Sequence, residues 1–563
     1  MKIDSLLKLA CAVALGSCGI EDRLPPLPTD AGTDADAMFS SEEELGGADH
    51  AGAAGSSGSS FDASIGGNAG AGGSGGADAP SDIGVGENGE SDNAADSRDS
   101  GCISPMSQCG QACVACINSC VEGRCCGDGR RNDAEECDGA DIVPTACEEA
   151  IAPGWIGTVT ACGTDCRFDT TPCSAPVTSY SSLNDTGKWE SYDLSKIDPA
   201  AKTFTGGAFD GRYVYFVNTN SLMLRFDTKG AFGQPQSWSS FDVSKINTNA
   251  VGFQGAAFDG RYIYFVPGLD VGRQRASGVV VRYDTQGSFD SPDASNSWFT
   301  FDVSVIDKRA AWFFGAIFDG RYVYLVPNYS SSVLVRYDTL APFDVVGSWA
   351  IHELLPHQYL VGGTFDGRYL YVSPNSSGPM PRFDTRGNFL SAASWANIDT
   401  QMFGANGEFG GALYDGTSLY LTPAAGSALR YDSRSSIDSV DSWSAFDIST
   451  VNTSTKGYYG AVFDGRYVYY PPYSTRFEQP VPASAISRYD TRATFNTPGA
   501  WSFFDLATIS PAAKWFFGGI FDGKYVYLIP GPQLGGNVVG STVVRFEAKS
   551  PSWLPKGWKA SFF

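Results

Sequence analysis

The histidines are the first candidates for chemistry, because imidazole binds zinc and transfers protons near neutral pH. The chain has three, and two of them, His352 and His357, lie in the segment His-Glu-Leu-Leu-Pro-His. A zinc site of the HExxH type needs two histidines four residues apart on one helix face. Here the spacing is five residues, and Pro356 would interrupt a helix. We therefore predict no metal ion in this segment, and no other residues indicate a cofactor.

Aspartate is the next candidate, since it recurs in two repeated sequences, Phe-Asp-Gly and Tyr-Asp-Thr. Carboxylates bind Ca²⁺, but aspartate is also favoured in turns, where its side chain accepts hydrogen bonds from backbone N–H groups. Seven copies of one catalytic acid are not expected in one enzyme, so we interpret the repeated aspartates as turn residues. Ca²⁺ binding by these turns is the alternative. We expect the basic residues that follow Asp-Gly to pair with neighbouring aspartates; they are Arg212, Arg261, Arg321, Arg368, Arg466 and Lys524.

The repeat region contains no sequence that marks a hydrolytic site. It lacks the Gly-x-Ser-x-Gly elbow of serine hydrolases and the Asp box of sialidases. We therefore name no catalytic residue and expect a protein that is not an enzyme. A hydrolase or lyase acting on extracellular polysaccharide is an outside alternative. It would require a carboxylate cluster or a His–Asp pair at the mouth of the fold.

Three signatures recur seven times each, in fixed order, and must position any site. The first, Phe-Asp-Gly-Arg-Tyr-Val-Tyr and its variants, has its aspartates at Asp210, Asp259, Asp319, Asp366, Asp415, Asp464 and Asp522. The second, Arg-Phe/Tyr-Asp-Thr, begins at Arg225, Arg282, Arg336, Arg382, Arg430, Arg488 and Arg545. The third, Trp-x-x-Phe-Asp, begins at Trp189, Trp238, Trp298, Trp349, Trp395, Trp443 and Trp501. A period of 47 to 60 residues indicates a propeller or a solenoid.

Each signature predicts β-structure. Asp-Gly between two apolar runs favours a hairpin with a type I′ turn, in which both central residues have positive φ. The other two signatures are rich in β-branched and aromatic residues and predict a third and a fourth strand. A glycine and a small residue stand in the first strand of each repeat, as the innermost strand of a crowded ring requires. Four strands in each of seven units predict an all-β fold, a seven-bladed β-propeller.

The order of the signatures resembles the kelch repeat, in which a tryptophan strand is followed by Asp-Gly-Lys-Leu-Tyr-Val-Val-Gly-Gly and then Tyr-Asp. The chain departs from that pattern after the second strand, where Val-Pro replaces Gly-Gly, as at Val266-Pro267 and Val326-Pro327. The resemblance implies a kelch-like propeller.

The ends of the array predict how the ring closes. The first tryptophan strand, Trp189–Asp193, precedes the first hairpin, and no clear fourth strand follows Arg545. We therefore predict that Trp189–Asp193 completes the seventh blade. The tail that starts at Ser552 is the alternative source of this strand.

Ligand-binding residues are expected where the repeats vary. The loops before the first strand and between the second and third strands share one face of a propeller, and loops on a rigid scaffold often bind ligands. Aromatic rings near the start of the first strand suit sugars or peptides. We predict a ligand face comprising Phe204, Phe253, Trp312, Phe313, Tyr359, Phe409, Tyr458, Tyr459, Trp515 and Phe516. Packing between blades is the alternative role of these rings.

Composition argues against one class of partner. The chain carries 62 acidic and 39 basic residues, a formal net charge of -23, which opposes binding to a nucleic-acid backbone. All fourteen cysteines lie within the first 173 residues. The repeats must therefore be stabilised by packing rather than by disulfide bonds.

The first 17 residues predict export. Lys2 and Lys8 accompany an apolar run that is too short to span a bilayer. The run ends in Leu-Gly-Ser-Cys at residues 15–18, which resembles the lipobox of bacterial lipoproteins. That resemblance implies lipidation of Cys18, and Gly19 in place of aspartate implies the outer membrane and the cell surface. The alternative is an ordinary signal peptide and a freely secreted protein.

Two further segments lie between the signal and the repeats. Residues 18–100 are rich in Gly, Ala, Ser and Asp and cannot bury enough apolar surface to fold, so we predict a disordered linker. Residues 101–175 hold an even number of cysteines, which predicts a disulfide framework of undetermined connectivity in an exported protein. These cysteines are Cys102, Cys109, Cys113, Cys116, Cys120, Cys125, Cys126, Cys137, Cys147, Cys162, Cys166 and Cys173.

The second half of this module contains Cys-Gly-Asp-Gly, Glu-Glu-Cys-Asp-Gly-Ala-Asp and Ala-Cys-Gly-Thr-Asp-Cys. It resembles the cysteine-rich repeats of myxobacterial surface proteins, which implies an extracellular disulfide module. With the propeller at residues 186–550 and a tail at 551–563, the sequence predicts a monomeric, lipid-anchored binding protein. A carbohydrate ligand is one hypothesis, and adhesion to or scaffolding of a protein partner is the other.

Overall fold

The computed structural model describes most of the chain after residue 130. The described residues are 131, 136–163, 167–270, 275–291, 294–328, 331–355, 358–376, 378–454, 457–473, 483–532 and 540–558, with the backbone of four short strands between 107 and 126. The predicted signal peptide, Cys18, the linker and the last five residues lie outside this part of the chain. No helix of the described residues is long and apolar enough to cross a membrane.

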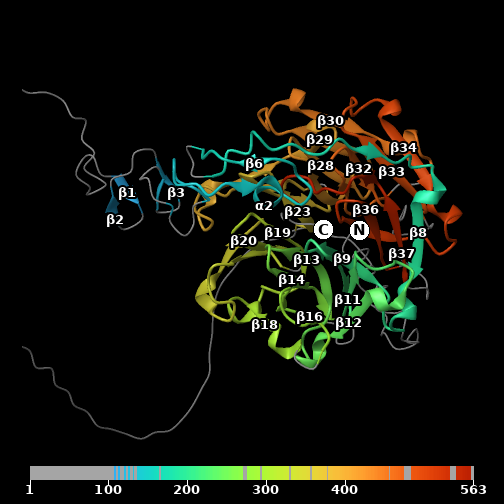
Figure 1. The fold of residues 1–563 in the computed structure, drawn as a ribbon, viewed down its shortest axis with the longest axis horizontal. Coiled ribbons are helices and arrows are strands. Elements are labelled where there is room, and N and C mark those ends of the chain that lie inside the picture. The colour runs from blue at the N-terminus through green and yellow to red at the C-terminus, as the bar shows by residue number, and fades with distance from the viewer. Residues whose placement is uncertain are drawn as a thin grey trace, which may run out of the picture. The chain divides into compact units, whose positions relative to one another are not determined.

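Seven antiparallel four-stranded sheets, the blades, are arranged around a common axis (Figure 1). Strands A, which contact one another around the axis, are β9 (Phe204–Phe209), β13 (Phe253–Phe258), β19 (Phe313–Phe318), β23 (Leu360–Phe365), β27 (Phe409–Tyr414), β31 (Val462–Phe463) and β35 (Phe516–Phe521). Strands B are β10 (Tyr213–Asn218), β14 (Tyr262–Pro267), β20 (Tyr322–Pro327), β24 (Tyr369–Pro374), β28 (Ser418–Pro423), β32 (Tyr467–Tyr470) and β36 (Tyr525–Pro530). Strands C are β11 (Leu222–Asp227), β17 (Val279–Asp284), β21 (Val333–Asp338), β25 (Met380–Asp384), β29 (Ala428–Asp432), β33 (Ala485–Asp490) and β37 (Thr542–Glu547). The outermost strands D are β12 (Trp238–Asp242), β18 (Trp298–Asp302), β22 (Trp349–Glu353), β26 (Trp395–Ile398), β30 (Trp443–Phe446), β34 (Trp501–Asp505) and β8 (Trp189–Asp193). The chain is a seven-bladed β-propeller, as the repeats predict.

The ring closes with a strand from the other end of the propeller, which confirms the prediction. In blade 7 the strand order is β35-β36-β37-β8. Within this sheet β8 is antiparallel to β37, with Trp189 opposite Phe546 and Asp193 opposite Thr542. The tail does not supply this strand. The residues just before it, Lys549–Ser550, form β38, which pairs with β7 (Ser179–Tyr180).

The paired small residues of strand A explain how seven blades meet at the axis. The first glycine of each pair has positive φ, for example 93° at Gly255 and 98° at Gly315, and a β-bulge interrupts the pairing there. A Cβ atom on Gly206 would lie 2.7 Å from the Cα of Gly255 in the next blade. Only glycine fits both the backbone conformation and this approach.

The Asp-Gly turns differ from the predicted type I′ turn. Strand A ends at Phe209 and strand B begins at Tyr213, so the loop has three residues, and only its glycine has positive φ, 101° at Gly211. The Asp210 carboxylate instead accepts hydrogen bonds from the backbone N–H groups of Arg212 at 2.8 Å and Tyr213 at 2.6 Å. These side-chain hydrogen bonds hold the turn without a second residue of positive φ. The prediction of a type I′ turn is therefore wrong.

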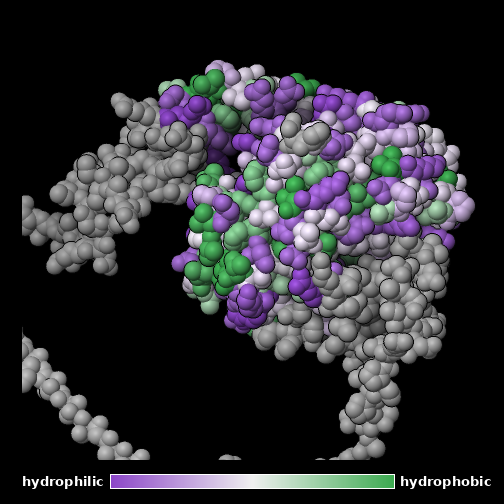
Figure 2. All heavy atoms as spheres, turned by 90° about the horizontal axis from the view of Figure 1, so that it is seen from below, coloured by the Kyte–Doolittle hydropathy of each residue, from purple (hydrophilic) through white to green (hydrophobic). Residues whose placement is uncertain are grey.

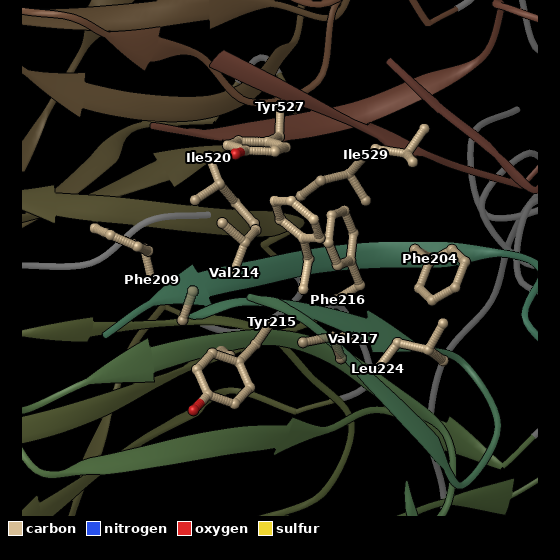
Figure 3. Packing of buried hydrophobic residues seen from close by; sticks show 14 of the residues in the cluster. Phe204, Phe209, Val214, Tyr215, Phe216, Val217, Leu224, Ile520, Tyr527 and Ile529 are labelled. Carbon is tan, nitrogen blue, oxygen red and sulfur yellow. The ribbon is translucent and has the colours of Figure 1, made fainter. Parts of the chain in front are cut away.

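Aromatic and aliphatic side chains fill the spaces between blades. Every strand-D tryptophan donates its indole N–H to an upstream backbone carbonyl at 2.8 to 3.2 Å. Each also stacks on a ring of the preceding blade, with centroid distances from 4.2 to 5.5 Å. Figure 3 shows the contact between blades 7 and 1, where Ile520 points toward Val214. This packing, rather than covalent bonds, stabilises the ring.

The cysteine-rich module and the tail pack against the propeller. The described part of the module contains β5 (Thr145–Ala146), α2 (Cys147–Ala150) and β6 (Thr158–Val159), and the backbone before it forms β1 (Ser107–Cys109), β2 (Ala112–Val114), β3 (Ser119–Val121) and β4 (Arg124–Cys126). Disulfide bonds join Cys137 to Cys162 and Cys147 to Cys173. The other predicted disulfide cysteines lie outside the described side chains.

Candidate functional site

The propeller has two unlike ends. At the hairpin end lie the Asp-Gly turns between strands A and B. At the opposite end, named here the mouth end, strands A begin and strands B lead into the loops before strands C. In blade 2 that loop forms the small hairpin of β15 (Leu269–Asp270) and β16 (Arg275–Ala276).

The hairpin end is covered by the chain itself. The Trp553 backbone N–H donates to the Gly523 carbonyl in the turn of blade 7 at 3.0 Å. The Trp558 ring lies 5.8 Å from Phe209 and 6.0 Å from Phe258, the last residues of two inner strands. The module covers the tail in turn, because the Trp155 indole donates to the Leu554 carbonyl at 2.8 Å. The tail and the module therefore cover the hairpin end and limit the access of a ligand to it.

The repeated acidic residues lie at the hairpin end and serve structural roles. All seven Phe/Tyr-Asp-Gly aspartates accept a hydrogen bond from a tyrosine hydroxyl of strand B at 2.6 to 2.8 Å. Burial raises the pKa of Asp319, and burial together with the adjacent carboxylate raises that of Tyr324. The turn arginines pair with Tyr-Asp-Thr aspartates at 2.6 to 2.9 Å, and Lys524 pairs with Glu547 at 3.7 Å. The interpretation of these residues as turn and ion-pair residues is confirmed.

The described residues contain no group of three or more His, Cys, Asp or Glu side chains arranged to hold a metal ion. His352 lies on strand D of blade 3 and stacks on Trp395 with a centroid distance of 4.2 Å. It takes the place that phenylalanine or tyrosine occupies in five of the other blades, and blade 4 has Ile398 there. His357 lies outside the described residues.

The predicted ligand-face aromatics all lie at the mouth end, but most are buried there. Nine of them are at most 8% exposed: Phe204, Phe253, Phe313, Tyr359, Phe409, Tyr458, Tyr459, Trp515 and Phe516. Those that begin strand A pack on strand B of their own blade, as Phe204 does on Phe216 at 6.0 Å. Only Trp312 is half-buried. The burial favours packing for the nine, whereas ligand binding by this end remains a prediction.

An aromatic plug fills the channel just below the mouth. It comprises Phe314, Val361, Tyr459, Tyr473, Trp515 and Phe517 from four blades. Phe314 of blade 3 lies 5.7 Å from Phe517 of blade 7, nearly opposite, and Phe517 stacks on Tyr459 at 4.8 Å. Blade 5 contributes only Gly410 at the equivalent position. Four of these residues, Phe314, Val361, Tyr473 and Phe517, escaped the sequence prediction. Three of them, all except Tyr473, lie at the second position of strand A, which varies more than its neighbours.

Trp312 and Trp515 adopt an unusual backbone conformation at the mouth. Each precedes strand A, and their φ angles are 60° and 65°, where blade 2 has Gly252 at 79°. Positive φ in a bulky residue costs on the order of 1 to 3 kcal/mol and persists only where the surroundings impose it. Trp515 is held by burial and by an edge contact with Tyr473 at 6.0 Å. No ring contact of this kind holds Trp312 among the described residues.

Several buried polar atoms at the mouth end have no hydrogen-bond partner among the described residues. They are Gln254 Oε1, Trp312 Nε1, Gln358 Oε1, Ser373 Oγ, Thr422 Oγ1 and Tyr473 OH. Buried polar atoms in folded proteins nearly always have partners, supplied by water or ligand where the chain supplies none. The mouth end therefore combines buried aromatic rings with neutral polar atoms that have no partner among the described residues.

No family model matches the chain, and no curated protein is similar to it. Many solved structures are similar to it in part, and two of them are described here. One is PorZ, described as an essential bacterial surface component of the type-IX secretion system of Porphyromonas gingivalis, with 12% identity over 66% of this chain and a TM-score of 0.40. The chain spans 40% of the length of PorZ. The other is YCF48 from Cyanidioschyzon merolae, with 12% identity over 64% of this chain and 99% of that one, and a TM-score of 0.41.

Proposed function

We propose that the protein is a lipid-anchored, extracytoplasmic binding protein whose kelch-like propeller captures its ligand at the mouth end. The observation that supports this most directly is the coverage of the hairpin end by the tail and the cysteine-rich module. Because the module precedes the propeller in the chain, a tether on Cys18 would lead to the hairpin end.

The side chains support a binding role over a catalytic one. The repeated carboxylates are engaged in turns and ion pairs at the hairpin end. At the mouth, the unpaired atoms belong to amides, hydroxyls and an indole, none of which ionises near neutral pH. A hydrolase or lyase needs an ionisable acid or base at its site. Binding without chemistry is the function that this set of groups serves best.

Two ligand classes fit the mouth. A glycan would use the aromatic rings and the neutral hydrogen-bonding groups, and a protein partner would use the same surface together with the loops around it. On the side of the propeller seen in Figure 2, hydrophobic residues occur in separate groups among hydrophilic ones. The aromatic rings and neutral polar groups of the mouth end lead us to propose carbohydrate as the ligand, with adhesion to a protein as the second candidate.

Two experiments test this proposal. Metabolic labelling with a palmitate analogue should mark the full chain but not Cys18→Ala, and that variant should leave the membrane fraction. Binding of the full chain to immobilised glycans and to surface proteins should then locate the ligand. Labelling that persists in Cys18→Ala contradicts the anchor, and binding to neither kind of ligand contradicts the binding function.

A further inference from the structure

We propose that two segments at the chain ends of the propeller form a clasp, which carries tension from the anchor past strand β8 and keeps the ring closed under load. The entry segment is residues 178–181, which lead from the cysteine-rich module to the propeller. The exit segment is residues 548–554, which follow strand C of blade 7. This inference depends on the lipid anchor of the proposed function and adds a mechanical role for these segments.

Strand β8 is the part of a tethered ring that most needs protection. A tethered protein that holds its ligand transmits any pull between anchor and ligand through its own chain. The anchor precedes the propeller, so the pull reaches β8 before any other propeller strand. As the outermost strand of blade 7, β8 is bonded on one side only, to β37 (Figure 1). Detachment of β8 would open the ring, so a load must be taken up before Trp189.

Backbone hydrogen bonds join the entry segment to the exit segment. Strands β7 and β38 are antiparallel, with Tyr180 opposite Lys549. One residue further along, the Ser181 N–H donates to the Ala548 carbonyl at 2.9 Å. The chain that enters the propeller and the chain that leaves it are thus held together before residues 182–188 lead to β8.

Trp553 connects both segments to the turns of blades 6 and 7. The residue is buried, and its indole N–H donates to the Thr178 hydroxyl oxygen at 2.7 Å. Its backbone N–H donates to the Gly523 carbonyl in blade 7 at 3.0 Å. In blade 6 its ring lies so close to Gly465 that a Cβ atom there would collide with it. Trp553 therefore transfers load from Thr178 to the ring.

Arg488 of blade 6 bonds differently from the arginines at the same position of other blades. In blades 1 and 2 this arginine donates to a tyrosine hydroxyl of the next blade, as Arg225 does to Tyr283 at 3.1 Å. The equivalent residue of blade 7 is Phe546, which has no hydroxyl. The Arg488 Nη1 atom instead donates to the Ser181 carbonyl at 3.0 Å. Because a charged donor forms a stronger hydrogen bond than a neutral one, blade 6 takes up part of the load.

The module and a buried lysine reinforce the clasp. The Leu554 N–H donates to the Pro153 carbonyl at 3.0 Å, and the Leu554 carbonyl accepts from the Trp155 indole at 2.8 Å. The Lys549 ammonium donates to the Asp464 carbonyl in the turn of blade 6. The path of the load therefore runs from the module through the exit segment to blades 6 and 7, and it bypasses β8.

The test applies force to the full chain along this path. One handle is attached in the linker at residue 21, and the other at Met402, an exposed residue at the mouth end of blade 5. The lifetime of the closed ring is measured at constant force, because forced unfolding is governed by the unfolding rate rather than by equilibrium stability. A second pair of handles, at Leu340 and Met402, loads blades 3 to 5 and leaves the clasp outside the path.

Two double variants are compared with the unaltered chain. Trp553→Phe with Arg488→Met removes two hydrogen bonds of the clasp and keeps apolar side chains in place. Trp443→Phe with Arg282→Met is the matched control, because these residues make similar hydrogen bonds in blades 5 and 2, at 2.8 and 3.2 Å. Thr178→Val removes only the acceptor of the Trp553 indole and is the milder clasp variant if the double variant fails to fold. The melting temperature monitors folding.

We expect the double clasp variant to shorten the lifetime of the closed ring by about tenfold or more in the pull from the linker, as for the loss of about one hydrogen bond. Thr178→Val should shorten it by less, and the control variant should leave it nearly unchanged. With handles at Leu340 and Met402, the clasp variant should last as long as the unaltered chain.

Equal lifetimes of the clasp variants and the unaltered chain in the pull from the linker overturn the clasp and leave the binding function standing. A similar fall in both pulling geometries also overturns it, since the variant has then lost general stability rather than a load-bearing contact. Persistent labelling of Cys18→Ala, by contrast, overturns the proposed anchor whatever the lifetimes are.

Discussion

The ring of Trp189, at the start of the propeller, lies 4.5 Å from the ring of Phe546, near its end. The two residues are opposite one another in the β8–β37 pairing, and Trp189 also stacks on Phe504 of blade 6 at 5.1 Å. Trp189 thus connects the two ends of the propeller and also packs in the interface between blades 6 and 7. We therefore expect closure by this strand to make the ring unfold as a single cooperative unit.

Removal of this strand should open the ring. We expect a chain that begins at residue 200 to lose cooperative unfolding, while a chain that begins at residue 176 keeps it. The single change Trp189→Ala should cost about 3 to 5 kcal/mol of unfolding free energy, as for other large-to-small changes in cores. Denaturant unfolding followed by fluorescence and circular dichroism measures both effects. An unchanged midpoint in the shorter chain would show that another segment completes blade 7.

The size of the second small residue of strand A is limited by its contact with the preceding blade. A Cβ atom on Gly519 would lie 2.7 Å from a methyl carbon of Val462 in blade 6 and 2.7 Å from the Tyr527 carbonyl oxygen. Gly519→Ala should therefore destabilise the protein by about 1 to 3 kcal/mol through overpacking. Val462→Ala in the same chain should recover part of that loss. A double-mutant cycle measures the coupling, and strictly additive effects would contradict direct contact.

The repeats carried enough information for the fold. Strand order, ring closure and the pairing of Arg212 with Asp227 all follow from local patterns that recur seven times. The turn type was mispredicted because the carboxylate of Asp210 forms hydrogen bonds that sequence statistics for Asp-Gly do not include.

The candidate site was less predictable, because the packing of its side chains depends on contacts across the axis of the ring. Phe314 reaches Phe517 only after the ring has closed, and no local pattern specifies such a contact. The sequence located the mouth end but could not separate buried rings from Trp312. That distinction required the φ angle of Trp312 and its partial exposure.

His352 should make stability depend on pH. Burial against Trp395 lowers its pKa below the ordinary value of 6.5, and the opposing effect of the neighbouring Glu353 is smaller. As pH falls through 6.5, the unfolded chain takes up a proton before the folded chain does, so the contribution of His352 to stability decreases. His352→Phe, which restores the ring found in other blades, should remove this component. Unfolding midpoints of both proteins between pH 7.5 and 5 test the prediction, and parallel curves would contradict it.

Lys549 should produce a second pH dependence, at higher pH. Its ammonium is fully buried, 3.1 Å from the centroid of the Trp553 ring, and it donates a hydrogen bond to the Asp464 carbonyl oxygen. Burial lowers the pKa of Lys549 to about 7, and the Asp464 carboxylate opposes that shift.

The unfolded chain therefore binds the Lys549 proton between pH 7 and 10.5 while the folded chain releases it. Stability from this group should rise as pH increases through that range. Lys549→Met keeps most of the apolar contact with Trp553 and cannot titrate, so its stability should be flatter with pH. It should equal or exceed that of the unaltered chain near pH 7, since replacing a buried charge by an apolar side chain is often neutral or stabilising. Unfolding free energies from pH 7 to 10 measure the difference, and a constant offset between the two proteins would show that Lys549 remains charged throughout.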